Sequence, residues 1–134
     1  MRIDDIRAEL AAALDVIPGL AAFGYWPDRI TPPAALVAWP DPYTYNATYQ
    51  RGASSAEINV VVLVGRPNSR AAQEALADYA AGSGERSVRA AIESHTTTAW
   101  HDATVTTFTG GTVQVNGVDY LAGTFAVQIF GQGD

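Results

Sequence analysis

One dipeptide, Asn116-Gly117, constrains the fold more than any other feature of this 134-residue sequence. A type I′ turn needs positive φ at both central positions, and Asn-Gly between two alternating segments is the strongest short-range signal for a β-hairpin. The alternation also predicts the register, in which Val115 opposes Val118 and Val113 opposes Tyr120. We therefore expect a β-hairpin in the C-terminal part of the chain.

The strand after this turn changes its apolar face. The clean alternation holds as far as Ala122-Gly123, and beyond it the apolar residues move to the odd positions Phe125, Val127 and Ile129. One continuous strand with a single buried face cannot satisfy both sets, so we predict a bulge or kink near Gly123. The strand before the turn begins with the threonine-rich stretch Ala103 to Thr109, which is typical of a sheet edge.

Helical spacing of apolar residues marks three segments. The first stripe begins at Ile3 and ends at Pro18-Gly19, and the next two are separated by Ser83-Gly84, which predicts a pair of helices or one kinked helix. Pro67-Asn68-Ser69 offers a start for this pair, and Glu85 with Arg89 has the spacing of a favourable i, i+4 ion pair. The stripes are Ile3, Ile6, Leu10, Leu14 and Ile17; Ala72, Ala75, Leu76 and Tyr79; and Val88, Ala91, Ile92 and His95.

Three further segments have strand patterns: Leu20 to Trp26, Ala34 to Trp39, and Glu57 to Val64. The last of them alternates at first, but Val61 and Leu63 make its second face apolar as well. A strand that is apolar on both faces is central or covered on both sides. In a chain this small, our hypothesis is that another subunit covers the second face.

The segment from Pro40 to Ser55 has no core pattern, which predicts a long loop or projecting arm. It carries Tyr43, Tyr45, Tyr49 and Arg51, residue types that are enriched in buried interfaces. Two interpretations stay open: an interface, or a solvated loop whose tyrosines lie back on their own domain. Stacking of nucleic-acid bases is disfavoured by the acidic balance of the chain.

Helices that interrupt strands joined by hairpins indicate an α+β fold. We expect a single domain, residues 1–134, with one mainly antiparallel or mixed β-sheet. An N-terminal helix and a central helix pair back this sheet, a C-terminal β-hairpin completes it, and the projecting loop lies at about 40–55.

Composition excludes several classes of function. The chain has no cysteine, and all eight basic residues are arginine, which rules out cysteine-ligated metals, thiolate nucleophiles and lysine-dependent chemistry. The net charge of −6 disfavours broad attraction to nucleic acid or anionic membranes. The N-terminus lacks the apolar stretch of a signal peptide, and no apolar run approaches the length of a membrane span. We expect a chain made in the cytoplasm, with no membrane partner.

The only histidines, His95 and His101, are the candidates for a metal site or acid–base pair, with Glu93 and Asp102 nearby. Their spacing does not place two ligands on one helix face, and a hydrolytic metal wants three protein ligands. The glycine-containing stretches match no phosphate-binding fingerprint. The residues therefore disfavour a metal site or acid–base catalysis at these positions.

The order and spacing of short strings along nearly the whole chain resemble the tail terminator (tail completion) proteins of long-tailed, non-contractile-tail phages. None of these strings is a catalytic signature. They are Met1–Leu10, Ile17–Leu20, Pro32–Ala35, Val62–Arg66, Ser69–Gln73, Tyr79–Gly84, Ser87–Ile92, Val118–Leu121 and Phe125–Val127.

The resemblance implies a structural virion protein without cofactor, metal or catalytic residues, so we expect that the chain is not an enzyme. It implies a homo-oligomeric ring, usually a hexamer, which sits on the last ring of the tail tube, stops tube growth and presents a surface to the head-side connector. DNA passes through such a ring without specific binding, in agreement with the acidic charge. A ring needs two different contact surfaces, for which the candidates are the central strand, at Val61 and Leu63, and the loop with Tyr43, Tyr45, Tyr49 and Arg51.

Two alternatives remain at this stage. Another ring-forming neck or connector protein is a close rival, because such proteins are also small and α+β. A small cone-shaped α+β enzyme or ligand-binding domain would instead use His95 or His101 with a carboxylate beside an aromatic-lined pocket.

Overall fold

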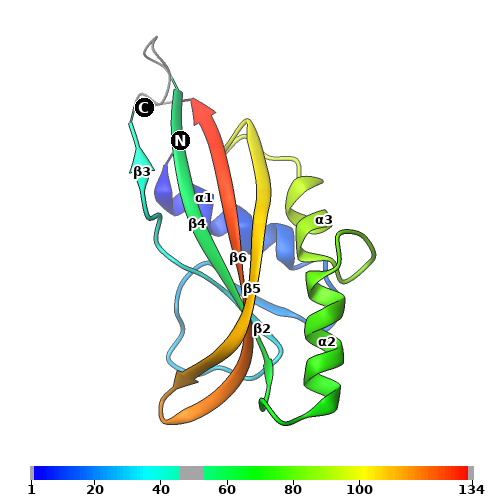
Figure 1. The fold of residues 1–134 in the computed structure, drawn as a ribbon. Helices are drawn as coiled ribbons and strands as arrows, with labels where there is room; N and C mark the ends of the chain where they lie inside the picture. Colours follow the sequence, from blue (N-terminus) through cyan, green and yellow to red (C-terminus); the bar gives the residue numbers. More distant parts are fainter. Residues whose placement is uncertain (1, 46–52, 133–134) are drawn as a thin grey trace.

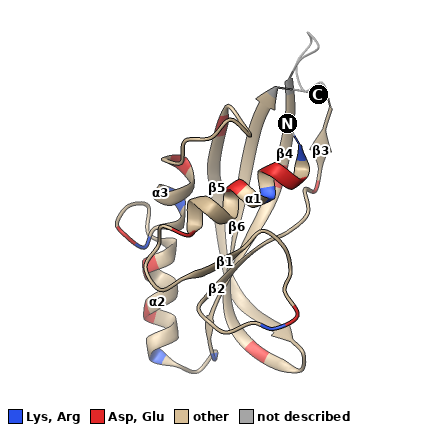
Figure 2. Ribbon diagram, turned by 180° about the vertical axis from the view of Figure 1, so that it is seen from behind, with Lys and Arg blue, Asp and Glu red and all other residues tan. Residues whose placement is uncertain are grey.

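The computed structural model describes residues 2–45 and 53–132, and it has an α+β fold. A six-stranded mixed sheet is covered on one face by three helices (Figures 1 and 2). The strand order is β1-β2-β4-β6-β5, with β3 beside β4. The elements are α1 (Ile3–Leu14), β1 (Ala21–Phe23), β2 (Ala34–Val37), β3 (Tyr43–Thr44), β4 (Ala53–Gly65), α2 (Arg70–Ala80), α3 (Val88–Glu93), β5 (Asp102–Val115) and β6 (Val118–Gln132).

Helix α1 packs the predicted stripe against the sheet. Ile6, Leu10 and Leu14 are fully buried, and Asp4 and Asp5 stand in the first turn, where negative charge is favourable. The helix ends at Leu14, one turn earlier than the stripe suggested. Ile17 is nevertheless buried in the core from the turn that follows.

The central helices form a pair, as predicted, and each begins at a serine cap. Ser69 accepts a hydrogen bond from the backbone N–H of Ala72 at 3.2 Å, and Ser87 accepts one from Ala90 at 3.1 Å. The predicted ion pair between Glu85 and Arg89 is wrong, because α3 begins only at Val88 and leaves Glu85 before the helix. Arg89 instead pairs one turn onward with Glu93, at 3.2 Å.

Strand β4 is central, as its two apolar faces predicted. It pairs with β2 and β3 on one side and with β6 on the other, in each case antiparallel. The expected loop from residue 40 to 55 is only partly a loop. Tyr43 and Thr44 form β3, which pairs with Ala56 and Ser55, and β4 already begins at Ala53. The pairing partners of these residues lie far along the chain, so local composition did not show them.

The hairpin of β5 and β6 has the predicted register, with Val115 opposite Val118 and Val113 opposite Tyr120. Asn116 and Gly117 have φ angles of 52° and 79°, as a type I′ turn requires. Strand β5 lies at the edge of the sheet, as its threonine-rich sequence indicated.

The bulge predicted near Gly123 is not in β6 itself but in the neighbouring strand β4, opposite Leu121 and Ala122. Strand β6 runs through this position without interruption, and the register shifts lie in its neighbours, between Leu63 and Gly65 of β4 and between Val105 and Thr107 of β5. The apolar face changes because the sheet has a core on each side. Phe125, Val127 and Ile129 face the main core under the helices, whereas Ala122 belongs to a smaller cluster on the opposite face.

This second cluster is built around three buried residues from three adjacent strands. Partly buried residues from β1, the loop after it and the hairpin close over them. A continuous strand therefore serves one core with its odd residues and the other with its even residues. The buried residues are Leu36, Leu63 and Ala122, and those that pack against them are Phe23, Ile30, Val61, Val113, Val115 and Tyr120.

Candidate assembly surface

Three aromatic side chains gather where the N-terminal half of α1 meets the segment between β2 and β3; Trp39 and Tyr45 are exposed, whereas Tyr43 is half-buried and packs against the main core. We call Arg7, Trp39, Tyr43 and Tyr45 the aromatic surface. Together with Arg2, Ile3 and Asp4 they line a hollow of about 480 Å³. Trp39 is 67% exposed and Tyr45 is 74% exposed, which leaves large apolar rings in solvent. Tyrosine, tryptophan and arginine are the residues most enriched at the centres of protein interfaces.

Arg7 anchors this surface. Its Nη2 donates a hydrogen bond to the backbone carbonyl of Val37 at 2.9 Å, and its guanidinium carbon lies 4.5 Å from the centroid of the Trp39 ring. Such a cation–π contact holds the indole in place. The Nε of Arg7 is buried without a hydrogen-bond partner. The arginine thus orients the exposed ring of Trp39.

The tyrosines are positioned by the pairing of β3 with β4. Their rings lie 4.9 Å apart, with an interplanar angle of 58°. Before them, the N–H of Asp41 donates to the carbonyl of Glu57 at 2.8 Å, and the N–H of Glu57 donates to the carbonyl of Pro42 at 3.0 Å. The segment that carries Tyr43 and Tyr45 is therefore fixed along β4. The other two predicted interface residues of this loop, Tyr49 and Arg51, lie outside the described residues.

Charged residues stand at the rim of the aromatic surface. Arg2 and Asp4 form an exposed ion pair of 3.1 Å between Nε and Oδ1. The hydrogen bond from Arg2 holds the pKa of the Asp4 carboxyl below its usual value. A solvent-exposed ion pair of this kind contributes little to the stability of the fold. Charges beside apolar rings at a protein surface act mainly on the choice of binding partner.

Trp39 is a member of the surface that the sequence did not reveal as such. Its pattern predicted the end of a strand, but β2 stops at Val37. Tyr25 and Trp26 were likewise expected in a strand, yet β1 stops at Phe23 and leaves both exposed. In each case a proline, Pro40 or Pro27, directly follows the tryptophan. This proline is the signal that marks the end of a strand and a ring outside the core.

Tyr25 and Trp26 follow a glycine that packs against the backbone of α1. Gly24 packs so tightly against this helix that a Cβ atom on it would lie 2.9 Å from the carbonyl oxygen of Arg7. Only glycine fits there, so the segment after β1 passes directly beside the main chain of Arg7 and Ala8. Tyr25 also packs edge-to-face on Phe23, with ring centroids 5.8 Å apart.

The predicted interface residues of β4, Val61 and Leu63, lie in the second cluster and not on the aromatic surface. Leu63 is fully buried in the second cluster, beside the half-buried Val61. The cover that we expected from another subunit comes for Leu63 from the chain itself. The loop after β1 and the β5–β6 hairpin pack over this face of the sheet. Both are far from β4 in sequence, so the pattern of β4 could not show that they cover it.

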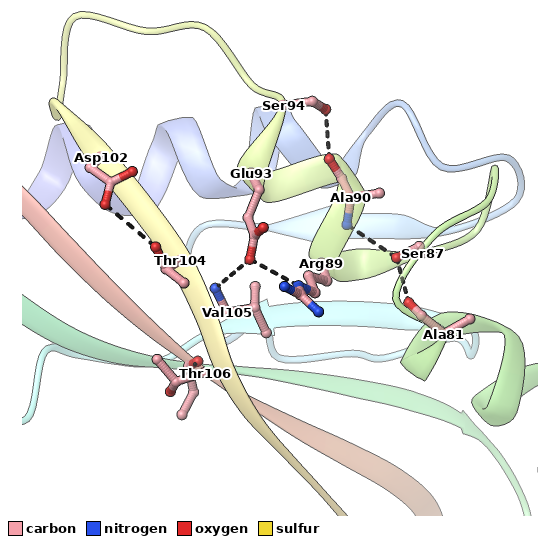
Figure 3. A network of polar contacts seen from close by, with 11 residues as sticks. Ala81, Ser87, Arg89, Ala90, Glu93, Ser94, Asp102, Thr104, Val105 and Thr106 are labelled. Carbon is pink, nitrogen blue, oxygen red and sulfur yellow. Dashed lines mark hydrogen bonds and ion pairs between the residues drawn. The ribbon is translucent and has the colours of Figure 1, made fainter.

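Of the two histidines, His95 has a structural partner. His95 Nε2 lies 2.7 Å from Glu9 Oε2 and thereby ties the end of α3 to α1, whereas His101 is exposed. The carboxylates that were candidates to act with them are engaged elsewhere. Glu93 binds Arg89 and the N–H of Val105, and Asp102 accepts from Thr104 (Figure 3). Across residues 2–45 and 53–132, no three His, Asp or Glu side chains gather as metal ligands would.

Every helix in the described part of the chain is too short or too polar to cross a membrane. A scan against models of known protein families gave no match, and neither did a search of curated proteins.

Proposed function

We propose that this chain is a structural virion protein that assembles into a homo-oligomeric ring, of six copies, at the head-proximal end of a phage tail tube. In this role it ends polymerisation of the tube and provides the joining surface for the head-side connector. Its partners are its own copies, the tail tube protein and the connector. The resemblance of its sequence to tail terminator proteins supports this role, and the aromatic surface is the observation that carries it.

The energetic argument rests on Trp39. A buried aromatic side chain removes about 150–250 Å² from water, and apolar area contributes about 25 cal/mol per Å². Because 67% of Trp39 is exposed in the single chain, a partner that covers the ring gains about 3 kcal/mol from it. Arg7 already holds the ring in place, so little side-chain entropy is lost on binding.

The charge of the chain agrees with a ring around passing DNA. A net charge of −6 on each copy repels the phosphate backbone, which keeps DNA from binding during transit. Charged residues lie mainly on helices and loops, as Figure 2 shows, while the long strands are nearly free of them.

Imaging of the purified protein by negative-stain electron microscopy tests the proposal. The wild-type chain is expected to form annuli, and Trp39→Ala is expected to weaken assembly by about 100-fold in concentration, which corresponds to about 3 kcal/mol. Val16→Ala is the matched control, because Val16 is 71% exposed but lies outside the aromatic surface. A wild-type chain that stays monomeric even with tail tubes present contradicts the proposal.

Labelling in assembled tails separates the two ring-forming roles. A tail terminator is found at the head-proximal end of tails that carry no head. A neck or connector protein, the alternative within this class, is found on heads that carry no tail.

A further inference from the structure

A hollow of about 280 Å³ lies between α2 and the turn that follows α1, and we call it the α2 groove. Pro18 and Gly19 of that turn border it, as do Pro33 before β2 and Gly65 at the end of β4. The aromatic surface adjoins the first turn of α1, so the two sites lie at opposite ends of this helix. The volume of the α2 groove is close to the lower limit for small-ligand sites, which measure roughly 300–1,000 Å³.

A hydroxyl group without a partner stands at one end of the α2 groove. Tyr79 borders the groove, although it is only 2% exposed and its ring packs in the main core. Within residues 2–45 and 53–132 its hydroxyl makes no hydrogen bond. Burial raises the pKa of Tyr79, so the hydroxyl keeps its proton at neutral pH and can donate it. Buried polar groups normally have partners, so this donor calls for an acceptor in the groove.

Arg86 supplies a positive charge at the same end. It also borders the α2 groove, and its ion pair with Asp78 is long, at 3.9 Å between Nη1 and Oδ2. Against the effect of burial, the charge of Arg86 lowers the pKa of Tyr79, which shows that the guanidinium group lies near the hydroxyl. A hydroxyl donor beside a guanidinium group suits a carboxylate, because hydrogen bonds to an ionised acceptor are the strong ones.

The other end of the α2 groove is the first turn of α2, where Ser69 and Ala71 border it. Ser69 caps the N–H of Ala72, but the N–H groups of Arg70 and Ala71 make no hydrogen bond within the described chain. This turn contains no acidic residue, so nothing in it offsets the positive end of the helix dipole. The start of α2 is basic instead, as Figure 2 shows. This end of the groove therefore also favours a negative group.

The distance between the two ends indicates the size of the ligand. Ser69 and Tyr79 are ten residues apart, which corresponds to about 15 Å of helix at about 1.5 Å per residue. Between the ends the groove is apolar, with Val64, Ala72 and Ala75 along it. A small organic acid reaches one end only. An extended peptide of about four or five residues, at about 3.3 Å each, reaches both.

We propose that the α2 groove binds an extended acidic peptide segment. One carboxylate lies between the Tyr79 hydroxyl and Arg86, a second lies at the first turn of α2, and an apolar side chain between them contacts Ala72 and Ala75. The segment is complementary to the groove in charge and in pattern, since donors occupy both ends and apolar side chains the middle. The site lies within one chain, so the proposal does not depend on the proposed function.

Fluorescence anisotropy with a rhodamine-labelled peptide, Glu-Ala-Val-Ala-Glu-amide, tests the groove on the full chain. The matched peptide Gln-Ala-Val-Ala-Gln-amide has the same shape without the carboxylates. The glutamate peptide is expected to bind, and the glutamine peptide is expected to bind at least about tenfold more weakly, because it forms no charge-assisted hydrogen bonds.

Two substitutions locate the bound peptide. Tyr79→Phe removes the hydroxyl and keeps the ring in the core, and Arg86→Gln removes the charge; each is expected to raise the Kd of the glutamate peptide at least about tenfold. Tyr25→Phe and Arg29→Gln are the matched controls, because they make the same changes at exposed positions outside the groove. Both controls are expected to leave the Kd unchanged, and thermal unfolding of every variant checks the fold.

Each contrary result overturns the proposal in its own way. If the glutamine peptide binds as tightly as the glutamate peptide, or if neither binds at low ionic strength, the groove is not a site for acidic segments. If Tyr79→Phe and Arg86→Gln bind like the wild type, the peptide lies elsewhere. If Arg29→Gln weakens binding as much as Arg86→Gln, the effect is one of net charge alone. None of these results bears on ring formation, so the proposed function is judged separately by imaging.

Discussion

Gly123 is the position where a single methyl group tests the packing of the whole hairpin against the helices. A Cβ atom on Gly123 would overlap the ring of Phe108 and would lie 2.8 Å from Leu76 Cδ1 of α2. To relieve this overlap, the Phe108 ring must move away from Phe125, with which it now packs at 5.0 Å between centroids. The loss of an aromatic pair costs about 0.5–1.5 kcal/mol, and overpacking as a whole costs about 1–3 kcal/mol.

We therefore expect Gly123→Ala to lower the free energy of unfolding by about 2 kcal/mol, which for a chain of this size lowers Tm by about 6 °C. The assay is urea denaturation followed by circular dichroism, with a thermal scan beside it. Gly111→Ala is the matched control, because a Cβ atom on Gly111 of the same hairpin meets nothing within 4 Å.

A double-mutant cycle with Phe108→Ala shows whether the ring is the cause. In the Phe108→Ala background, Gly123→Ala is expected to cost about 1 kcal/mol less, since the ring that it overlaps is gone. If Gly123→Ala proves as stable as Gly111→Ala, or if its cost does not depend on Phe108, the explanation of this glycine is refuted.

Three further predictions concern other parts of the fold. Leu63→Ala is expected to lower the free energy of unfolding by about 3 kcal/mol, because it opens a cavity in the second cluster. Val61→Ala is expected to lower it by less, because Val61 is only half-buried. Equal losses of unfolding free energy in chemical denaturation would contradict this difference in burial. Ser69→Ala is expected to lower the free energy of unfolding by about 1 kcal/mol, measured by thermal unfolding, because it removes the N-cap of α2. Ser83→Ala is the matched control and is expected to be neutral, because Ser83 is not the N-cap of a helix. Burial raises the pKa of Tyr79 above its usual value, so its contribution to stability is complete below about pH 10 and is lost as the pH rises through the higher folded pKa. Tyr79→Phe should flatten this alkaline decline in the unfolding free energy, and an unchanged slope would show that another group causes it.

Features that depend on neighbours along the chain followed from the sequence alone. The Asn116-Gly117 turn determined the hairpin and its register, because the backbone of two residues decides which strand positions face each other. The spacing of apolar residues placed the three helices, and a serine before α2 located its start. The α+β fold class and the central position of β4 followed from the same local periodicities.

Tertiary structure alone decided how the two faces of the sheet are covered. The change of apolar face at Gly123 predicted a bulge, whereas the real cause is a second core made by segments far apart in sequence, and this core also buries Leu63. The aromatic surface has the same origin, because Arg7 reaches Trp39 and the carbonyl of Val37 only when α1 packs across the end of β2. A sequence pattern records which side chains share a face of one element. Which distant element covers that face, and which rings remain in solvent, depends on long-range packing that no single segment encodes.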